Sequence, residues 1–365
     1  MYKLHFVVGV ILGVMVTLTV DYLQFQEVRP SLGVAYESST TASFPPLLPP
    51  LVPPPAVIGA AVQRLEFGAV RLHLDDLRPR LLEEFADRKI TVLVILPNRL
   101  LSRLAANSSV AVEILRPILS AEHSVSTISV GDEPPISLFP AVLPALHNVE
   151  KALRILNVQA SLSVTLGFGD LLHPPPILSQ LLYFLSERSS VLLVKMDVYG
   201  YFKAYRYPLR FAIFQNNETH SFNPEHPLAQ RYKSLFDLMV HGVQDVLTVS
   251  GFDKLPIVVA ETGWPTSGGQ SDAEANPANA RLFWNGIVAR MVAGAGVRVK
   301  VKQVFLYRLL DPVSPGLGLG WGMLSPDLSR VFGTEMPTVW FKTFWALVNG
   351  FMDFFQTVHD MYTTS

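Results

Sequence analysis

Two glutamates follow runs of apolar and β-branched residues in a pattern that suits acid–base chemistry. Residues 257–265 read IVVAETGWP, so Glu261 lies where an apolar strand would end in a Gly-Trp-Pro turn. Residues 126–133 read STISVGDE, which places Glu133 after a second such run. Paired carboxylates at strand ends can cleave a glycosidic bond, because one acid protonates the leaving oxygen while the other attacks the sugar or activates water. The two segments therefore indicate a glycosidase site.

Other catalytic chemistries have weak support in the sequence. The chain contains no cysteine, which excludes thiol catalysis, Cys-bound metals and disulfides. Its nine histidines show neither the i, i+4 pair nor the companion glutamate of a zinc-binding helix. The glycine-rich run at 316–322 lacks the spacing of a phosphate-binding loop, and no Gly-x-Ser-x-Gly nucleophile elbow is present. We therefore expect no metal and no cofactor.

Composition indicates that much of the chain is buried or faces a membrane. The 365 residues are many for one ordinary domain, but they suit a decorated α/β barrel. Charged residues make up 16% of the chain, well below the usual fraction of about 25%. Because 29 basic and 30 acidic residues give a net charge of −1, we expect no general attraction to nucleic acid or to anionic lipid.

Eight apolar runs alternate with helical patterns after residue 30. We predict strands at residues 33–36, 69–72, 91–96, 125–130, 160–166, 191–198, 257–260 and 301–306. Helices are predicted at 56–66, 80–88, 110–121, 143–156, 177–187, 232–249, 279–293 and 339–355. The strand-like runs are apolar on both faces, so the α/β fold class expected is a (β/α)8 TIM barrel. An open, doubly wound parallel sheet remains the alternative, because the pattern fixes the strand count only to within one or two.

Two segments interrupt the regular alternation. The proline-rich residues 44–55 lead into a helical pattern, where proline is well tolerated, so we interpret them as a long first βα loop and not as a linker. Residues 203–228 are predicted to form a small insertion after strand six, on the barrel face that carries the two acids. Its aromatic and amide side chains suit sugar binding, with a packed subdomain as the alternative. The barrel domain is expected to cover residues 31–357.

The first 25 residues predict a signal peptide or a signal anchor. Residues 5–20 are almost wholly apolar, but they are short for a membrane span of about 20 residues and no clear cleavage site follows them. A buried N-terminal helix is a further alternative. Asn107 and Asn217 begin N-glycosylation sequons. We expect a protein secreted to the cell wall or apoplast, with membrane attachment through the N-terminal segment as the alternative.

Several motifs resemble those of glycoside hydrolase family 17, the plant β-1,3-glucanases. The resemblance covers about residues 33–332 and is strongest at 232–240 and 257–265. The second of these segments matches the family signature almost residue for residue. Weaker matches are at 96–98, 144–148, 198–202 and 321–327. The resemblance implies a (β/α)8 barrel that hydrolyses β-1,3-glucan with retention of configuration. We expect this polysaccharide as the partner and a monomeric enzyme.

The same resemblance implies roles for individual residues. Glu261 corresponds to the nucleophile and Glu133 to the general acid/base, whose pKa the like charge of Glu261 would raise. Tyr199 is similar to a tyrosine that holds the attacked sugar and can hydrogen-bond to the nucleophile. Core packing is the alternative role for the aromatic residues. The further candidates for contacts with the sugar are Tyr36, Asp132, Phe202, Phe214 and Trp264.

Some positions depart from the family pattern. Asp132 stands where the family usually has asparagine, His73 and Leu74 replace a Tyr-Asp pair, and residues 304–311 lack the usual glutamate. An ionised Asp132 can only accept hydrogen bonds, whereas an amide can also donate, so Asp132→Asn is expected to raise activity. These departures leave open a second function, that of a catalytically impaired barrel that binds glucan in the cell wall.

Overall fold

The computed structural model describes residues 31–38, 53–119, 124–215, 232–269, 272–293, 299, 301–311, 319–325 and 327–329. They belong to one compact unit, Pro30–Phe332. The predicted N-terminal signal, the last predicted helix, the expected domain end at residue 357 and the sequon at Asn217 all lie outside the described residues, as does much of the insertion after strand six.

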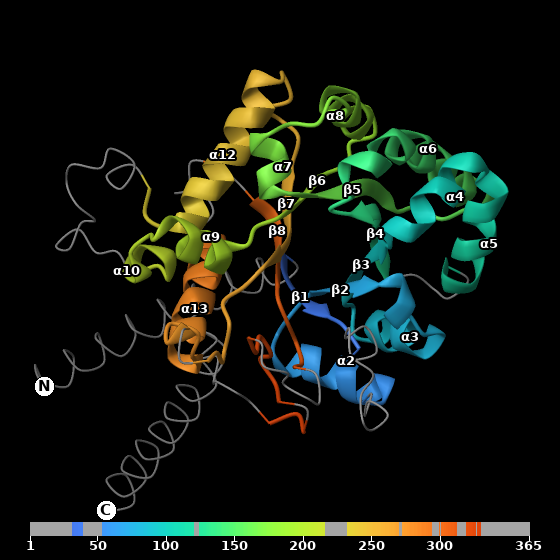
Figure 1. Ribbon diagram of the computed structural model, residues 1–365. Coiled ribbons are helices and arrows are strands. Elements are labelled where there is room, and N and C mark those ends of the chain that lie inside the picture. The colour runs from blue at the N-terminus through green and yellow to red at the C-terminus, as the bar shows by residue number, and fades with distance from the viewer. Residues whose placement is uncertain are drawn as a thin grey trace, which may run out of the picture. The chain divides into compact units, whose positions relative to one another are not determined.

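Eight parallel strands close into a barrel, and they neighbour one another in sequence order (Figure 1). Because β1 pairs with both β2 and β8, the sheet has no open edge, which confirms the (β/α)8 fold and excludes the doubly wound sheet. The strands are β1 (Leu32–Tyr36), β2 (Ala69–His73), β3 (Thr91–Leu96), β4 (Val125–Asp132), β5 (Ser161–Gly167), β6 (Leu192–Lys195), β7 (Ile257–Thr262) and β8 (Val301–Leu306).

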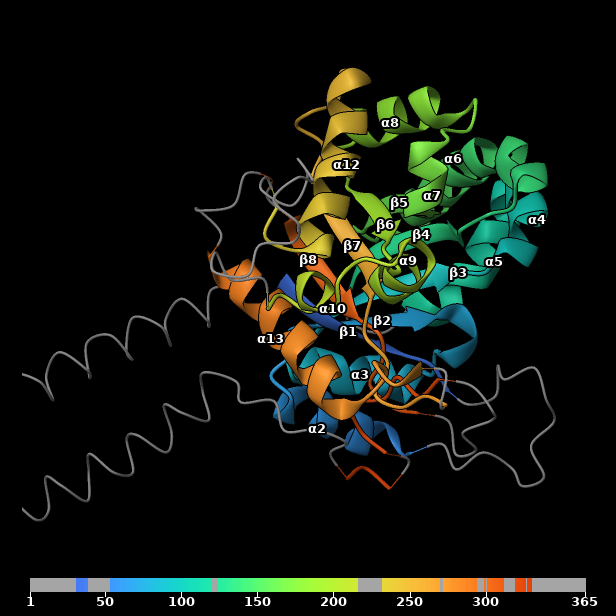
Figure 2. The ribbon, with the colours of Figure 1, turned by 60° about the vertical axis from the view of Figure 1, so that its left-hand side comes forward.

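Helices surround the strands (Figures 1 and 2). The α-helices are α2 (Pro55–Arg64), α3 (Pro79–Asp87), α4 (Leu101–Ala106), α5 (Ser108–Leu119), α6 (Phe139–Leu156), α7 (Phe168–Leu172), α8 (Leu178–Glu187), α9 (Val198–Tyr205), α10 (Leu209–Ala212), α12 (Leu235–Val249) and α13 (Pro277–Ala293). Short 3-10 helices are η3 (Leu74–Asp76), η4 (Asn98–Leu100) and η5 (Ile136–Leu138). Within the described part of the chain, none of the helices combines the length and the apolar character that crossing a membrane requires.

Apolar side chains of the strands form a buried cluster inside the barrel. Gly33 in β1 lies against the ring of Phe305 in β8, and a side chain at Gly33 would overlap that ring. Glycine at this position therefore lets Phe305 fill the barrel. Eight side chains that form a buried cluster are Ala69, Leu93, Ile95, Val191, Leu193, Val258, Ala260 and Phe305.

Strand six ends earlier than the sequence pattern predicts, at Lys195 instead of residue 198. Asp197 caps the helix that follows, because its carboxylate accepts a hydrogen bond of 2.8 Å from the backbone N–H of Gly200. The apolar residues after Lys195 thus belong to the turn and to α9. Lys195 becomes the last residue of β6, at the carboxyl end of the barrel.

Candidate active site

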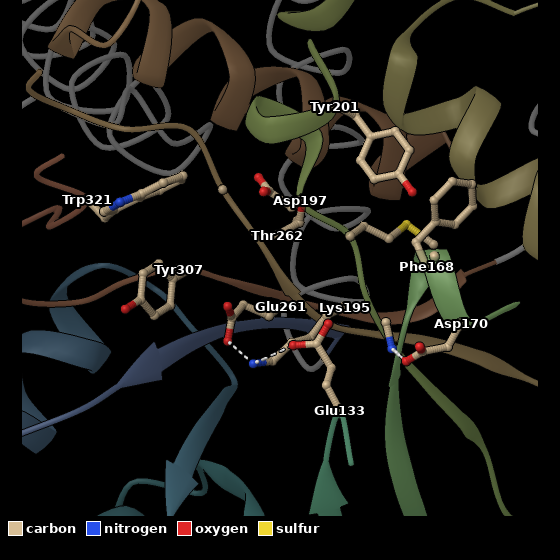
Figure 3. A pocket seen from close by; sticks show the side chains of 14 residues that line it. Glu133, Phe168, Asp170, Lys195, Asp197, Tyr201, Glu261, Thr262, Tyr307 and Trp321 are labelled. Carbon is tan, nitrogen blue, oxygen red and sulfur yellow. Dashed lines mark hydrogen bonds and ion pairs between the residues drawn. The ribbon is translucent and has the colours of Figure 1, made fainter. Parts of the chain in front are cut away.

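Glu133 and Glu261 meet at the carboxyl end of the barrel, where active sites of this fold lie. Glu133 follows β4 and Glu261 belongs to β7, and both line one pocket with a cavity of about 460 Å³. Figure 3 shows the two carboxylates near each other, with the amine of Lys195 between them. The structure thus brings together the two acids that the sequence singled out, although they are far apart in the chain.

The backbone around Glu133 is held in an unusual conformation. Glu133 has a φ of 46°, in the left-handed region that non-glycine residues seldom adopt. Its N–H donates to the carbonyl of Thr165 at 2.8 Å. The Asn98 side chain also fixes the neighbouring residue, since it donates to the carbonyl of Asp132 at 2.7 Å and accepts from the N–H of Asp132 at 2.8 Å. These contacts hold the Glu133 backbone at the edge of the pocket.

Gly167, the last residue of β5, makes room for the Glu133 carboxylate. A Cβ atom at Gly167 would lie 2.6 Å from Glu133 Oε1, closer than real Cβ contacts allow. The backbone N–H of Gly167 donates to Asp170 Oδ2 at 2.9 Å, which fixes the start of α7. The absence of a side chain at this strand end therefore sets the position of the proposed acid/base.

Arg71, in the middle of β2, is a fully buried cation beneath the pocket. Its Nη2 donates to Asp132 Oδ2 at 2.9 Å, and its Nη1 lies 2.9 Å from Glu261 Oε2 in an ion pair that lacks hydrogen-bond alignment. Burial alone would lower the pKa of Arg71, but the charges of Glu261 and Asp132 outweigh it and raise the pKa. Arg71 therefore stays charged, and it fixes two of the carboxylates.

Lys195 contacts three carboxylates at once, as Figure 3 shows for two of them. Its Nζ lies 3.1 Å from Asp132 Oδ2, 3.3 Å from Glu133 Oε2 and 3.5 Å from Glu261 Oε2. Burial would lower the pKa of Lys195, but attraction to these three groups raises it overall, so the ammonium stays protonated. Since one nitrogen reaches both glutamates at 3.3 and 3.5 Å, the two Oε2 atoms are at most about 7 Å apart.

The environments of Glu133 and Asp132 push their pKa values in opposite directions. Burial raises the pKa of Glu133, and the charges of Asp132 and Glu261 add to this effect while Lys195 opposes it. Burial also favours a neutral Asp132, but Arg71 and Lys195 outweigh burial and lower the pKa of Asp132. Glu133 is thus the carboxyl that tends to hold a proton, and Asp132 is a fixed negative charge.

A second charged group lies beside Arg71, at the ends of β1, β2 and β8. Glu37 Oε1 is 3.4 Å from His73 Nε2, and Glu37 Oε2 accepts a hydrogen bond of 3.1 Å from the Tyr307 hydroxyl. Burial would raise the pKa of Glu37, but His73, Arg71 and Arg308 together lower it to about 2. His73, which departs from the family pattern, thus has an acidic partner that follows the first strand.

Most of the aromatic residues expected at the sugar lie behind the pocket wall. Trp264 is completely buried and its Nε1 donates to the carbonyl of Glu274 at 2.9 Å. The rings of Phe202 and Tyr199 pack on Trp264, with centroids 5.2 and 5.0 Å from the indole. The Tyr199 hydroxyl donates a hydrogen bond of 3.1 Å to Asp272, and not to Glu261 as the family resemblance implies. These rings pack against one another, which removes them from the pocket surface.

Two further candidates also lie away from the pocket lining, and one of them, Phe214, is half-buried. Tyr36 is only 2% exposed, and Phe214 packs between the rings of Phe236 and Phe283. The structure instead brings a different set of aromatic residues to the pocket, and these are Phe168, Tyr201, Tyr307 and Trp321. Of this set, Tyr201 and Trp321 fall within the weaker family matches.

Sequence reasoning missed Arg71, Lys195 and Glu37. For two of them the sequence did carry a signal, namely a single cation in an apolar strand. Arg71 lies within the apolar residues of β2, and Lys195 ends the apolar run of β6. A lone cation in a buried strand needs acidic partners. The identity of those acids depends on the closure of the barrel, which brings side chains of β2, β4, β6 and β7 into contact.

Comparison with known proteins places this arrangement in a family. The model of the glycosyl hydrolases family 17 matches residues 67–336. Glucan endo-1,3-beta-glucosidase 4 of Arabidopsis thaliana is 28% identical over 311 residues, which cover 76% of this chain and 60% of that protein. A glucan endo-1,3-beta-glucosidase of Brassica campestris is 27% identical over 294 residues, or 73% of this chain and 84% of that protein. The chain thus covers 60% of the length of the Arabidopsis relative.

Solved structures share the fold. A β-1,3-glucanase and allergen of Cryptomeria japonica pollen superposes with a TM-score of 0.70 at 20% identity, over 84% of this chain and 98% of that one. A plant β-glucan endohydrolase gives a TM-score of 0.69 at 20% identity, over 83% of this chain and 100% of that one. At such identities the likeness shows the barrel alone. The family match, which runs from the start of β2 through every later strand, shows that this chain belongs to the glycosyl hydrolases family 17.

Proposed function

We propose that this protein is a retaining endo-hydrolase of β-1,3-glucan, with Glu261 as the nucleophile and Glu133 as the general acid/base. One observation carries the proposal, namely the approach of these two carboxylates across one pocket at the carboxyl end of the barrel. The linkage and the endo mode come from the names of the relatives, which are glucan endo-1,3-beta-glucosidases. The geometry of the site supports the chemistry.

In the first step, Glu261 attacks the anomeric carbon of the bound sugar. Its Oε2 is held by Arg71 and Lys195, so we assign the attack to Oε1. A bond forms between this oxygen and the anomeric carbon while the bond to the leaving sugar breaks, and Glu133 gives its proton to the leaving oxygen. The raised pKa of Glu133 favours the proton that this step requires.

In the second step, Glu133 acts as a base. It takes a proton from a water molecule, whose oxygen attacks the anomeric carbon and releases the Glu261 carboxylate. Each step inverts the configuration at that carbon, so the product keeps the configuration of the substrate. The carboxyl groups of retaining enzymes are about 5 to 5.5 Å apart, against about 6.5 to 9.5 Å in inverting ones. The upper bound of about 7 Å between the two Oε2 atoms is compatible with the retaining distance and excludes most of the inverting range.

Aromatic side chains on the pocket surface are the proposed contacts for the sugar rings. Trp321 and Tyr307 lie on one side of Glu261, with ring centroids 5.7 Å apart. Tyr201 and Phe168 lie near the other side, at 5.3 Å from each other. Flat rings of this kind can stack on the apolar faces of glucose units. We assign Trp321 as the main stacking surface for the sugar that Glu261 attacks.

Incubation of the purified protein with laminarin tests the proposed function. We expect new reducing ends from the wild type and none from Glu261→Gln or Glu133→Gln, which change one catalytic group with little change in volume. The alternative of a glucan-binding barrel without catalysis predicts that laminarin binds to the wild type but that no reducing ends form. Such a result would reject hydrolysis and leave binding as the function.

We also propose that the protein enters the secretory pathway and reaches the cell wall or apoplast. The support comes from the apolar N-terminal residues and from the sequon at Asn107, whose side chain is exposed between α4 and α5. Expression in plant cells should give a glycoprotein whose mobility changes on deglycosylation. Asn107→Gln should remove part of that change, and a cytosolic, unglycosylated product would contradict the proposal.

A further inference from the structure

Lys195 is placed between the two catalytic carboxylates by the register of the barrel. In the parallel ladder, Lys195 pairs with Glu261 on β7 and with Gly167 on β5. Gly167 is the residue whose missing side chain admits the Glu133 carboxylate. Strand six therefore presents its last side chain to the gap between the two acids. The weaker family match in this region begins only at Val198, so no motif assigned Lys195 a role.

We propose that Lys195 stabilises the single negative charge that Glu133 and Glu261 share, first on Glu261 and then on Glu133, through both steps of the reaction. The inference rests on the catalytic roles proposed above for the two glutamates. It goes beyond them because it adds a third group that contacts both reacting carboxylates. The ammonium lies 3.3 Å from one and 3.5 Å from the other.

The charge of the pair moves during the reaction but does not change in amount. Before the first step, Glu261 is ionised and Glu133 holds a proton. When Glu261 has become an ester with the sugar and Glu133 has given its proton to the leaving oxygen, Glu261 is neutral and Glu133 is ionised. A cation at nearly equal distance from both groups stabilises these two states to a similar extent. The charge can therefore pass from one acid to the other without losing its partner.

Arg71 cannot take this role, because it contacts only one of the two acids. Its ion pairs are with Glu261, Asp132 and Glu37. Asp132 already has the buried Arg71 as a partner at 2.9 Å, so it does not need Lys195 for charge balance. A purely structural role for Lys195, as a second partner of Asp132, would lower stability when Lys195 is replaced but would leave the titration of Glu133 largely unmoved.

A titration of the glutamate side chains by carbon-13 NMR separates the two roles without relying on activity. The wild type, Lys195→Met, Lys195→Arg and Lys254→Met would be compared, with Glu133→Gln used to assign the Glu133 signal. Lys254 is exposed and precedes β7, at the opposite end of the barrel from the pocket, so it is the matched control. We expect the pKa of Glu133 to rise by about one unit in Lys195→Met, because an attractive positive charge is lost. Lys195→Arg and Lys254→Met should stay close to the wild type.

The same variants would be assayed on laminarin over a range of pH. For Lys195→Met we expect kcat to fall by at least about tenfold with little change in KM, because the charge balance matters most in the transition state. The alkaline limb of the kcat profile should move upward with the pKa of Glu133, and Lys195→Arg should restore most of both properties.

An unchanged Glu133 titration in a folded Lys195→Met protein would overturn the inference. If Lys195→Met does not fold, Lys195→Gln gives the same test with a polar side chain. A wild type that cuts no glucan, although its Glu133 titration depends on Lys195, would reject the proposed function and leave the interaction of Lys195 with Glu133 in place. Activity and titration thus report separately on the two proposals.

Discussion

Arg71 Nη1 lies 2.9 Å from Glu261 Oε2, and the Arg71 side chain has no exposed surface. Removal of one partner from a buried ion pair leaves the other charge without compensation, at a cost of about 3 to 5 kcal/mol. We predict that Arg71→Met lowers the free energy of unfolding by about this amount and reduces kcat more than it changes KM. Denaturation in urea measures the first effect.

The control for this change is Arg154→Met, because Arg154 pairs with Glu150 on the protein surface. Exposed pairs contribute at most about 1 kcal/mol, so Arg154→Met should be close to the wild type in stability and in activity. Equal losses in the two variants would show that the pair of Arg71 with Glu261 has no special importance.

Gly167→Ala is predicted to damage catalysis with little effect on the fold. The new Cβ would lie 2.6 Å from Glu133 Oε1, and the free end of the Glu133 side chain can move away at small cost. A displacement of about 1 Å in a reacting group can reduce the rate about 100-fold, so we expect kcat to fall by about 10- to 100-fold. Gly269→Ala is the matched control, because nothing lies within 4 Å of a Cβ at that position. Normal turnover by Gly167→Ala would place the acid/base elsewhere.

The stability of the fold should depend on Glu37 in a way that changes with pH. The folded-state pKa of Glu37 is about 2, below its ordinary value of 4.5. The ionised group therefore stabilises the fold above its ordinary pKa, and this contribution disappears as the pH falls towards 2. We predict that Glu37→Gln is less stable than the wild type at neutral pH by on the order of 2 kcal/mol.

Urea denaturation at several pH values measures the difference between the two proteins. It should narrow steadily as the pH falls from 4.5 to about 2. A gap that is the same at all pH values would mean that Glu37 contributes through packing and not through its charge.

The structure changes the expectation for Asp132→Asn. Comparison with the family alone predicts a gain in activity, but Asp132 Oδ2 lies 2.9 Å from Arg71 and 3.1 Å from Lys195. Loss of this charge weakens the hold on both cations, so we now predict lower stability, by about 1 to 3 kcal/mol, and lower kcat. The like charge of Asp132 also raises the pKa of Glu133, so the alkaline limb of the activity profile should move downward. A more active variant would favour the comparison with the family.

The barrel and its two acids were predictable because they follow local patterns. Each strand is a short run of apolar and β-branched residues, and Glu133 and Glu261 stand at the ends of two such runs. Parallel strands of a barrel end on one face, so both acids had to reach the same end. Strand six was the least accurate prediction, because the cap formed by Asp197 starts a helix where the apolar run continues.

The cations and the sugar-facing aromatics were not predictable from local patterns. Arg71 meets Glu261 only because closure of the barrel brings the side chains of β2 and β7 together, although the two residues lie 190 positions apart in the sequence. Trp264 belongs to the clearest motif but packs on Tyr199 and Phe202. Whether an aromatic ring faces the pocket or the core depends on its neighbours in space, which periodicity does not reveal.

The configuration of the first product tests the central claim most directly, because it depends on the distance between Glu133 and Glu261 and on the role of each. Laminarin digestion followed by proton NMR in the first minutes distinguishes the two anomers before they interconvert. We predict that the β-anomer forms first and that the α-anomer grows only by mutarotation. If the α-anomer accumulates first, the enzyme inverts configuration, and Glu261 does not form a covalent bond to the sugar.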